Sequence, residues 1–431
     1  MQNQYITVFN KESCQEKHYR NPSIVITQSG TLVACCDMRK FGHGDYPNKI
    51  DKVVRRSEDG GITWQEKIIA VEEQGRVKNY SSIAIGNCMV YDDVRNVILL
   101  FYTHMPANCN IDNCQKGIGE DSSGNKFLTR GKMTFTMRRN KVYYEEIDCG
   151  LTVDEQGNIK KNGQQVCNIY TQEVVINEIP TAYLYVVKSF DEGKSWSKPQ
   201  PINYQVKEPY MSYIAVGGSR GIKITRGKYK GRLVVPIYYN TGKGLIKKFS
   251  SAVIYSDDNG VTWKRGKTPN ECRKRYGLKL DHRLMLKRES LSDCQVIDNE
   301  DGNLVMFMRN FTKYNHLSVA TSKDGGLTWT DYKIRKDLPS GACGFSIINC
   351  KVNDKEAVVF ANPADEDLCR NCLFRVSFDG GKTFSKQILF KKDGFFNSSI
   401  VQLEDGSFGI IFEPSVMFNK IYYGVMPKED L

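Results

Sequence analysis

Three cysteine pairs have a spacing that could support chemistry. Cys369 and Cys372 form a Cys-x-x-Cys pair, but no second pair lies at zinc-finger spacing, so a metal site is weakly supported. Cys109 and Cys114 flank a short loop and could form a disulfide in an oxidising compartment. Cys35-Cys36 lies in an apolar run, where buried free thiols are the usual outcome. None of these cysteines has an evident catalytic companion, and we expect no metal and no cofactor.

The charge of the chain favours anionic partners. The formal net charge is +12, and the lysine and arginine residues are spread along the chain rather than gathered into one arm. A dispersed positive field attracts anions in general. Nucleic acid binding would need a basic stripe with base-stacking aromatic residues or a known motif, and neither is present. We therefore expect no nucleic acid partner.

Length and composition indicate a globular chain. The 431 residues suffice for one large domain or two smaller ones, and 40% hydrophobic with 26% charged residues is ordinary for such a protein. No apolar run approaches the roughly 20 residues that cross a bilayer. Residues 1–5 lack the basic and apolar stretches of a signal peptide. We expect a cytoplasmic protein, or a secreted one whose leader has been removed.

One octapeptide pattern, Ser-x-Asp-x-Gly-x-(Thr/Ser)-(Trp/Phe), occurs five times. Asp accepts hydrogen bonds from nearby backbone N–H groups and Gly supplies a positive φ, so each copy predicts a tight hairpin turn. All four tryptophans of the chain stand at the last position of a copy, which excludes coincidence. The copies span residues 57–64, 189–196, 256–263, 322–329 and 377–384.

A β-rich run precedes each copy, and further short strands lie between copies. Examples are Tyr183–Val187 and Ala252–Tyr255 before two copies, and Gly302–Met308 between two others. Helical periodicity is scarce. Many short strands, with one turn motif repeated once per unit, are typical of a propeller built from four-stranded blades.

These repeats resemble the Asp boxes of the sialidase (neuraminidase) superfamily. The segment Tyr19-Arg20-Asn21-Pro22 resembles the Phe-Arg-Ile-Pro motif that opens sialidase domains, and Gly231–Pro236 and Ile254–Asp258 resemble central segments. The resemblance covers nearly the whole chain and is greatest to bacterial exo-α-sialidases. It implies an all-β fold, a six-bladed β-propeller with a carboxylate-binding pocket at its centre.

One interval between repeats, from Trp64 to Ser189, is much longer than the others. Within it, residues 106–179 resemble the small β insertion that some bacterial sialidases carry between early blades. The runs Lys132–Met137 and Val142–Tyr144 look like strands, which disfavours a disordered linker. We expect residues 1–105 and 180–431 to form the propeller and residues 106–179 to form the insertion.

The resemblance also implies a binding site for sialic acid, which carries a carboxylate on its anomeric carbon. Such a site needs permanently charged groups with bidentate geometry, and arginine supplies them. The three family arginines match Arg20, Arg309 and Arg370, and Glu413 matches the glutamate that braces the first of them. Arg39 matches a further arginine that shapes the sugar pocket. A sialylated glycan or free sialic acid is the expected partner.

The general acid/base of the family matches Asp45, which follows Arg39 by six residues. By the resemblance, Asp45 would protonate the leaving glycosidic oxygen and later deprotonate water. Asp51 is the alternative for this role. Asp45 also follows Gly44, and a turn aspartate with no catalytic role is the alternative interpretation.

The sequence departs from the family in the nucleophile region. Sialidases use a tyrosine activated by a glutamate, because a carboxylate nucleophile would be repelled by the carboxylate of the substrate. The glutamate position holds Asp293, one methylene shorter, and Glu289 could replace it only in a rearranged loop. The tyrosine position holds Asn397, whose amide cannot act as that nucleophile. Asn21 is a smaller departure, since the opening motif usually has an aliphatic residue there.

Three functions remain open on this basis. The first is an exo-α-sialidase-like glycoside hydrolase that uses another nucleophile, either a nearby tyrosine or a water activated by Asp293. The second is a sialic-acid-binding lectin that has lost hydrolysis. The third is a propeller that serves only as a scaffold for protein contacts, which retention of the arginines disfavours.

Overall fold

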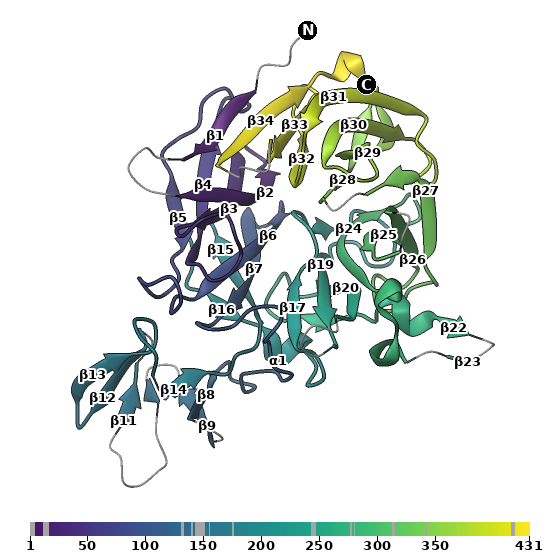
Figure 1. Ribbon diagram of the computed structural model, residues 1–431. Coiled ribbons are helices and arrows are strands. Elements are labelled where there is room, and N and C mark those ends of the chain that lie inside the picture. The colour runs from purple at the N-terminus through teal and green to yellow at the C-terminus, as the bar shows by residue number, and fades with distance from the viewer. Residues whose placement is uncertain are drawn as a thin grey trace.

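The computed structural model describes most of the chain, and its regular secondary structure consists almost entirely of β-strands (Figure 1). The few helices are short: α1 (Asn203–Val206), η1 (Pro269–Cys272), η2 (His282–Leu284), η3 (Lys287–Glu289) and η4 (Lys428–Asp430). The described residues are 5–11, 17–130, 133–138, 141–142, 151–154, 156–174, 176–242, 247–275, 278–279, 281–312, 315–340, 343–414 and 419–431.

The first half of the chain forms one eight-stranded sheet in two antiparallel parts. The two parts meet at a single parallel pairing, between Ile50 and Ile83. The first part contains β2 (His18–Ile26), β3 (Leu32–Arg39), β4 (Ile50–Ser57) and β5 (Ile68–Val71), and the second contains β6 (Ile83–Asp92), β7 (Val97–Met105), β15 (Tyr183–Ser189) and β16 (Gln200–Pro201).

The second half forms four further antiparallel sheets. Three of them use consecutive strands, and the last unites the two ends of the described chain because β1 pairs with β34. They contain β17 (Tyr213–Val216), β18 (Ile222–Lys223), β19 (Leu233–Asn240), β20 (Phe249–Ser256) and β21 (Lys264–Arg265); β24 (Leu291–Asp298), β25 (Leu304–Asn310), β26 (His316–Ser322) and β27 (Lys333–Pro339); β28 (Ser346–Val352), β29 (Lys355–Pro363), β30 (Arg370–Ser377) and β31 (Lys386–Gly394); and β1 (Ile6–Asn10), β34 (Lys420–Met426), β33 (Phe408–Phe412) and β32 (Ser398–Gln402).

The sheets contact one another in a closed ring. Strand β2 contacts β6, β6 contacts β17 and β19, β19 contacts β24, β24 contacts β28, β28 contacts β32, and β32 contacts β2 again. Figure 1 shows these strands nearest the centre of the ring. Apolar residues fill the space between sheets, for example Leu32, Ile411 and Tyr423 between the first and last. The innermost strands therefore surround a common centre.

The five octapeptides form the predicted turns. In the first copy, Ser57 Oγ donates to Asp59 Oδ1 (2.8 Å), and the backbone N–H of Thr63 donates to Asp59 Oδ1 (2.9 Å). The hydroxyl of Thr63 donates to the other oxygen of Asp59 (2.5 Å), and Gly61 has a φ of +96°. The same pattern recurs in the other four copies. These hydrogen bonds lower the pKa of Asp59 to about 2.

The region 106–179 contains two small sheets outside the ring, and Figure 1 shows them at its periphery. One has β8 (Phe127–Arg130), β9 (Met133–Arg138), β10 (Lys141–Val142) and β14 (Ile176–Glu178), and the other has β11 (Leu151–Val153), β12 (Asn158–Lys161) and β13 (Gln164–Asn168). They share a core that includes Leu128, Ile159 and Tyr170. Of the strands predicted here, Lys132 and residues 143–144 lie outside the described residues.

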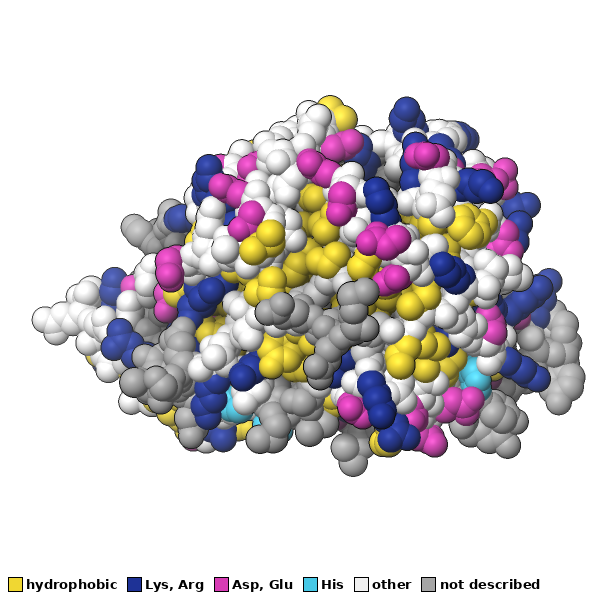
Figure 2. Space-filling model, turned by 90° about the horizontal axis from the view of Figure 1, so that it is seen from above, with side chains coloured by type: hydrophobic (Ala, Val, Ile, Leu, Met, Phe, Trp, Pro, Cys, Tyr) yellow, Lys and Arg dark blue, Asp and Glu magenta, His cyan; other side chains and the backbone are white. Residues whose placement is uncertain are grey.

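The surface carries both signs of charge. On the face in Figure 2, acidic and basic side chains are interspersed, with apolar side chains between them. No helix within the described residues has the length and apolar character that crossing a membrane requires.

Candidate active site

A cavity of about 530 Å³ opens where the central strands meet. Five of the eight residues that the sequence singled out line it: Arg20, Asp45, Asp293, Arg309 and Asn397. They come from three different sheets or the loops beside them, and they are up to 377 positions apart in the chain. The cavity is therefore assembled by the ring as a whole.

Arg20 is held from behind by a buried carboxylate. Its Nε atom lies 3.6 Å from Oε1 of Glu413, whose side chain is fully buried at the end of β33. The next residue, Asn21, has a φ of +53° at an irregularity in the pairing of β2 with β3. Asparagine tolerates this left-handed conformation, whereas an aliphatic residue would be strained there. The bulge aims the Asn21 N–H at Glu413 Oε1 (2.5 Å).

Arg309 and Asp293 form the opposite side of the cavity. Nη1 of Arg309 lies 3.3 Å from Oδ2 of Asp293, and both side chains are partly exposed. Glu289 does not line the cavity; it is buried, pairs with Arg273 (3.1 Å) and accepts the backbone N–H of Leu286 (2.7 Å). Of these two carboxylates, Asp293 is therefore the one that lines the cavity.

Asp45 is fixed by Arg39, which is fully buried. Nη1 of Arg39 lies 2.7 Å from Oδ1 of Asp45 and also donates to the carbonyl of His43. Arg39 is not among the lining residues, so its place is behind Asp45. Asp51 is also absent from the lining; it is buried and pairs with Lys40 (3.1 Å), and burial raises its pKa. Of the two candidates for the general acid/base, Asp45 lines the cavity and Asp51 does not.

A second buried carboxylate, Asp37, ties these residues together. It accepts hydrogen bonds from Lys52 (2.5 Å), from the side chain of Asn21 (2.7 Å) and from the side chain of Asn87 (3.0 Å), and Arg39 lies at 3.3 Å. Burial alone would raise the pKa of Asp37, but the positive charges of Lys52 and Arg39 outweigh it and lower the pKa. Asp37 therefore remains charged and anchors both Asn21 and Arg39.

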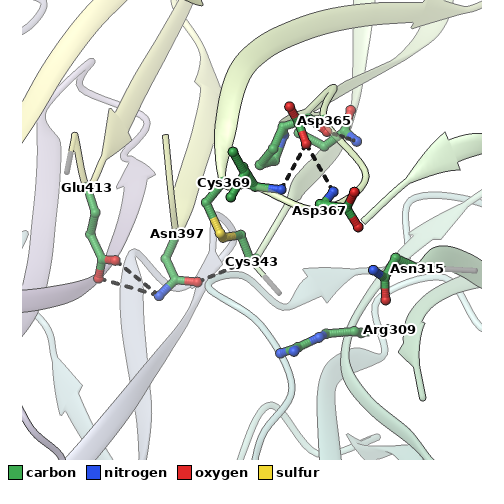
Figure 3. Close-up of a disulfide and its surroundings, with 12 residues drawn as sticks. Arg309, Asn315, Cys343, Asp365, Asp367, Cys369, Asn397 and Glu413 are labelled. Atoms are coloured by element: carbon green, nitrogen blue, oxygen red, sulfur yellow. Dashed lines mark hydrogen bonds between the residues drawn. A yellow bond between two sulfur atoms is a disulfide. The ribbon is translucent and has the colours of Figure 1, made fainter. Parts of the chain in front are cut away.

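The side chain of Asn397 is held on both sides. Its Oδ1 accepts the backbone N–H of Gly344 (3.1 Å), and its Nδ2 donates to Oδ1 of Asn21 (3.0 Å) and lies 3.4 Å from both carboxylate oxygens of Glu413. Figure 3 shows this amide between Glu413 and the loop of Cys343. The amide thus forms a fixed, neutral part of the cavity wall.

Arg370 is not among the lining residues, and its role stays a prediction. Its Nε pairs with Oδ2 of Asp365 (2.6 Å), and half of its side chain is exposed. It follows Cys369, which forms a disulfide with Cys343, and Gly344 beyond that disulfide lines the cavity. The backbone of Arg370 is therefore tied to the rim.

That disulfide was missed by the sequence analysis, which considered Cys369 and Cys372 only as a weakly supported metal-binding pair. Cys372 is a buried free thiol, and the true partner stands 26 positions upstream of Cys369. The sulfur atoms of Cys109 and Cys114 lie 3.1 Å apart, and both are free thiols. Among the described residues no cluster of three or more His, Cys, Asp or Glu side chains is arranged to hold a metal.

Two tyrosines that line the cavity also escaped the sequence analysis. Tyr213 and Tyr238, at the start of β17 and near the end of β19, lie side by side with their ring centroids 5.9 Å apart. Burial raises the pKa of both phenols, and the negative charges of Asp45 and Asp293 raise it further. Both phenols are thus neutral at ordinary pH. No motif marks them; only their place at the cavity end of their strands could have indicated them.

Comparison with known proteins agrees with this geometry. Residues 159–410 match the family described as BNR repeat-like domain, which is more than half of the chain. The five Asp boxes have the form that these repeats take. The chain belongs to the BNR repeat-like family and to the sialidase superfamily.

Similar curated proteins are the anhydrosialidase of the leech Macrobdella decora and a sialidase of Bacteroides fragilis. The first is 24% identical and the second 25% identical, over 93% and 92% of this chain. This chain spans 58% and 60% of the length of those two proteins.

Solved structures share the fold. The leech intramolecular trans-sialidase has a TM-score of 0.81 at 22% identity, over 99% of this chain and 71% of that one. The intramolecular trans-sialidase of Ruminococcus gnavus has a TM-score of 0.79 at 21% identity, over 100% of this chain and 98% of that one. These proteins are β-propellers, and the present chain shares that architecture.

Proposed function

We propose that the chain is a six-bladed sialidase-type propeller, with residues 106–179 as an insertion, and that it is an exo-α-sialidase-like glycoside hydrolase. It would remove terminal sialic acids from glycoconjugates. The observation that carries the proposal is the joint presence of Arg20, Arg309 and Asp45 in one cavity, with Glu413 bracing the first arginine. The two parts of the eight-stranded sheet count as two blades.

In this proposal the arginines hold the substrate by its carboxylate. Arg20 and Arg309 line the cavity, and guanidinium groups bind a carboxylate in a fixed orientation. Arg370 would complete the set by leaving Asp365 for the ligand. Asp45, held by Arg39, would protonate the glycosidic oxygen as the bond to the anomeric carbon breaks.

Water is the nucleophile that best fits this cavity. The Asn397 amide is not nucleophilic, and the raised pKa values of Tyr213 and Tyr238 keep both phenols neutral. Asp293 would accept a proton from water while the water oxygen bonds to the anomeric carbon. Arg309, 3.3 Å away, offsets the repulsion between Asp293 and the substrate carboxylate.

A second function, a sialic-acid-binding lectin, is favoured by one observation. The fixed Asn397 amide leaves the arginine-lined cavity intact while removing the tyrosine on which the family's chemistry depends. The two functions make different predictions for turnover but the same prediction for binding.

Turnover of a fluorogenic α-sialoside by the purified chain distinguishes them. Asp45→Asn and Asp293→Asn variants are compared with the wild type, and binding of free sialic acid is measured by calorimetry for all three. Hydrolysis that falls about 10²- to 10⁴-fold in each variant, with binding retained, supports the enzyme. Binding without turnover supports the lectin, and absence of both refutes the proposal. Mass spectrometry of the released sugar identifies the reaction, because an anhydro sialic acid is lighter by one water than the free sialic acid that hydrolysis releases.

A further inference from the structure

The connection between β21 and β24 combines basic residues with exposed leucines. Residues 273–288 contain seven lysine and arginine residues and one aspartate. Within this segment, here called the basic loop, Leu278, Leu284 and Leu286 are 74%, 75% and 46% exposed. One sign of charge therefore dominates in the basic loop.

The outward orientation of Leu284 and Leu286 is built into the fold. Met285, between them, is buried and accepts a hydrogen bond at its sulfur from the side chain of Asn270 (3.4 Å). The carboxylate of Glu289 caps the turn by accepting the backbone N–H of Leu286 (2.7 Å). Because Met285 points inward, its two neighbours must point outward. Their exposure is therefore a property of an ordered turn.

Most of the positive charge in the basic loop is uncompensated. Arg283 pairs with Asp281 (2.6 Å), but Lys274, Lys279, Lys287 and Arg288 are exposed and form no ion pair with any described residue. Free cations beside exposed leucines match a surface that presents anions above an apolar layer. A soluble polyanion would satisfy the cations but would leave the leucines in water.

The basic loop lies on the cavity side of the ring. It leads into β24, and Asp293 near the start of β24 lines the cavity. Figure 1 shows β22 (Lys274–Arg275) and β23 (Leu278–Lys279) projecting beyond the neighbouring sheets. The Asp boxes occupy the other ends of the strands, since Ser57 ends β4 whereas Asp45 precedes it. A surface bound by the loop would therefore lie beside the cavity mouth.

We propose that the basic loop docks the protein on anionic lipid bilayers. Leu278, Leu284 and Leu286 enter the boundary between headgroups and acyl chains, and the free lysine and arginine residues contact anionic headgroups. This proposal uses no residue of the candidate active site and does not depend on the proposed enzymatic activity.

Vesicle co-sedimentation tests the proposal with the full chain. Vesicles of phosphatidylcholine alone are compared with vesicles that also contain phosphatidylglycerol. We expect binding only to the anionic vesicles, at least tenfold weaker for Leu284→Ser/Leu286→Ser and for Lys287→Glu/Arg288→Glu. All four residues are exposed, so these variants should fold, which circular dichroism checks.

Matched controls come from the Asp boxes on the opposite side. Ile62→Ser/Val261→Ser replaces two apolar residues that are 71% and 58% exposed, and Lys323→Glu/Lys382→Glu replaces two exposed lysines. Both controls should bind vesicles as the wild type does. Equal loss in a control would overturn the proposal, as would absence of vesicle binding. Binding lost in the charge variant, retained in the leucine variant and abolished by heparin would identify a polyanion site instead.

Discussion

The side-chain Nδ2 of Asn397 donates a 3.0 Å hydrogen bond to Oδ1 of Asn21, so two of the three residues predicted to depart from the family motifs contact each other. Both also contact Glu413, which in turn lies behind Arg20. The amide pair thus completes the network that orients the first arginine.

A double-mutant cycle tests this relationship. Asn21→Ala and Asn397→Ala should each lower the free energy of unfolding by about 1–2 kcal/mol, because each leaves a polar group short of a partner. The double variant should lose less than the sum, by roughly 0.5–1.5 kcal/mol. Urea unfolding measures all four proteins. Strict additivity would show that the hydrogen bond contributes nothing to stability.

Arg309 should contribute directly to ligand affinity. Arg309→Ala removes a charged hydrogen-bond donor from the cavity, which typically costs about 1.5–3 kcal/mol, or roughly 10- to 150-fold in Kd. Calorimetry with free sialic acid measures the loss. Arg226→Ala is the control, because Arg226 pairs with Glu356 and does not line the cavity. Comparable losses in both variants would point to a general effect of charge.

Substitution of Arg370 tests the three-arginine pocket more sharply, because Arg370 is paired with Asp365 and is not among the lining residues. If it turns to the ligand, Arg370→Ala should weaken binding about as much as Arg309→Ala. An unchanged Kd would remove the third arginine from the site and discredit the three-arginine pocket.

The disulfide between Cys343 and Cys369 should stabilise the rim of the cavity. It closes a loop of 26 residues, and loop-closure entropy predicts a loss of about 3–4 kcal/mol for Cys343→Ser/Cys369→Ser. Because Gly344 holds Asn397, ligand affinity should fall as well. Cys272→Ser controls for the substitution itself, since Cys272 is a partly buried free thiol. A double variant as stable as the control would show that the disulfide does not stabilise the fold.

A buried charge cluster should make the stability of the chain depend on pH. His104 on β7 lies 2.9 Å from Glu73 and 3.3 Å from Glu178, and Lys126 lies 2.7 Å from Glu178. Burial would lower the pKa of His104, but Glu73 and Glu178 raise it above its ordinary 6.5. Burial would raise the pKa of both glutamates, yet their cationic partners lower it below 4.5.

The directions of these pKa shifts define the pH range in which the cluster stabilises the fold most. The raised histidine pKa stabilises the fold fully below pH 6.5, and this stabilisation is lost as pH rises through the folded-state pKa. The stabilisation that comes from the lowered glutamate pKa values is present above pH 4.5 and is lost as pH falls through the folded-state pKa values. The difference in unfolding free energy between wild type and His104→Gln should therefore be largest between pH 4.5 and 6.5.

Urea unfolding at several pH values measures this difference. Comparison with the variant is needed because Glu120, whose pKa burial raises to about 7, titrates in a similar range. Tyr170 also contacts Glu178 (2.8 Å), but its pKa is raised by burial and it stays neutral in this pH range. If the difference in unfolding free energy between the wild type and His104→Gln did not change with pH, the His104 cluster would not be the source of the pH dependence.

Motifs predicted the turns well and the partners of side chains poorly. The Asp boxes determine their own geometry within eight residues, so Asp59 and Gly61 could be assigned from the sequence alone. The residues selected by the family motifs include five that line one cavity: Arg20, Asp45, Asp293, Arg309 and Asn397.

Contacts between distant segments could not be predicted. The partner of Cys369 is Cys343 rather than the nearer Cys372, because the strand pairing of β30 sends Cys372 into the core. Tyr213 and Tyr238 belong to no motif and reach the cavity only through the position of their strands. The pairing of Arg370 with Asp365 depends on the conformation of one loop.

The most direct test of the account is a crystal structure of the chain with a sialic acid analogue that carries the anomeric carboxylate. The account predicts that this carboxylate lies within hydrogen-bonding distance of Arg20 and Arg309, with Asp45 beside the anomeric oxygen and Asn397 below the sugar ring. A ligand bound elsewhere, or one whose carboxylate contacts neither arginine, would contradict it.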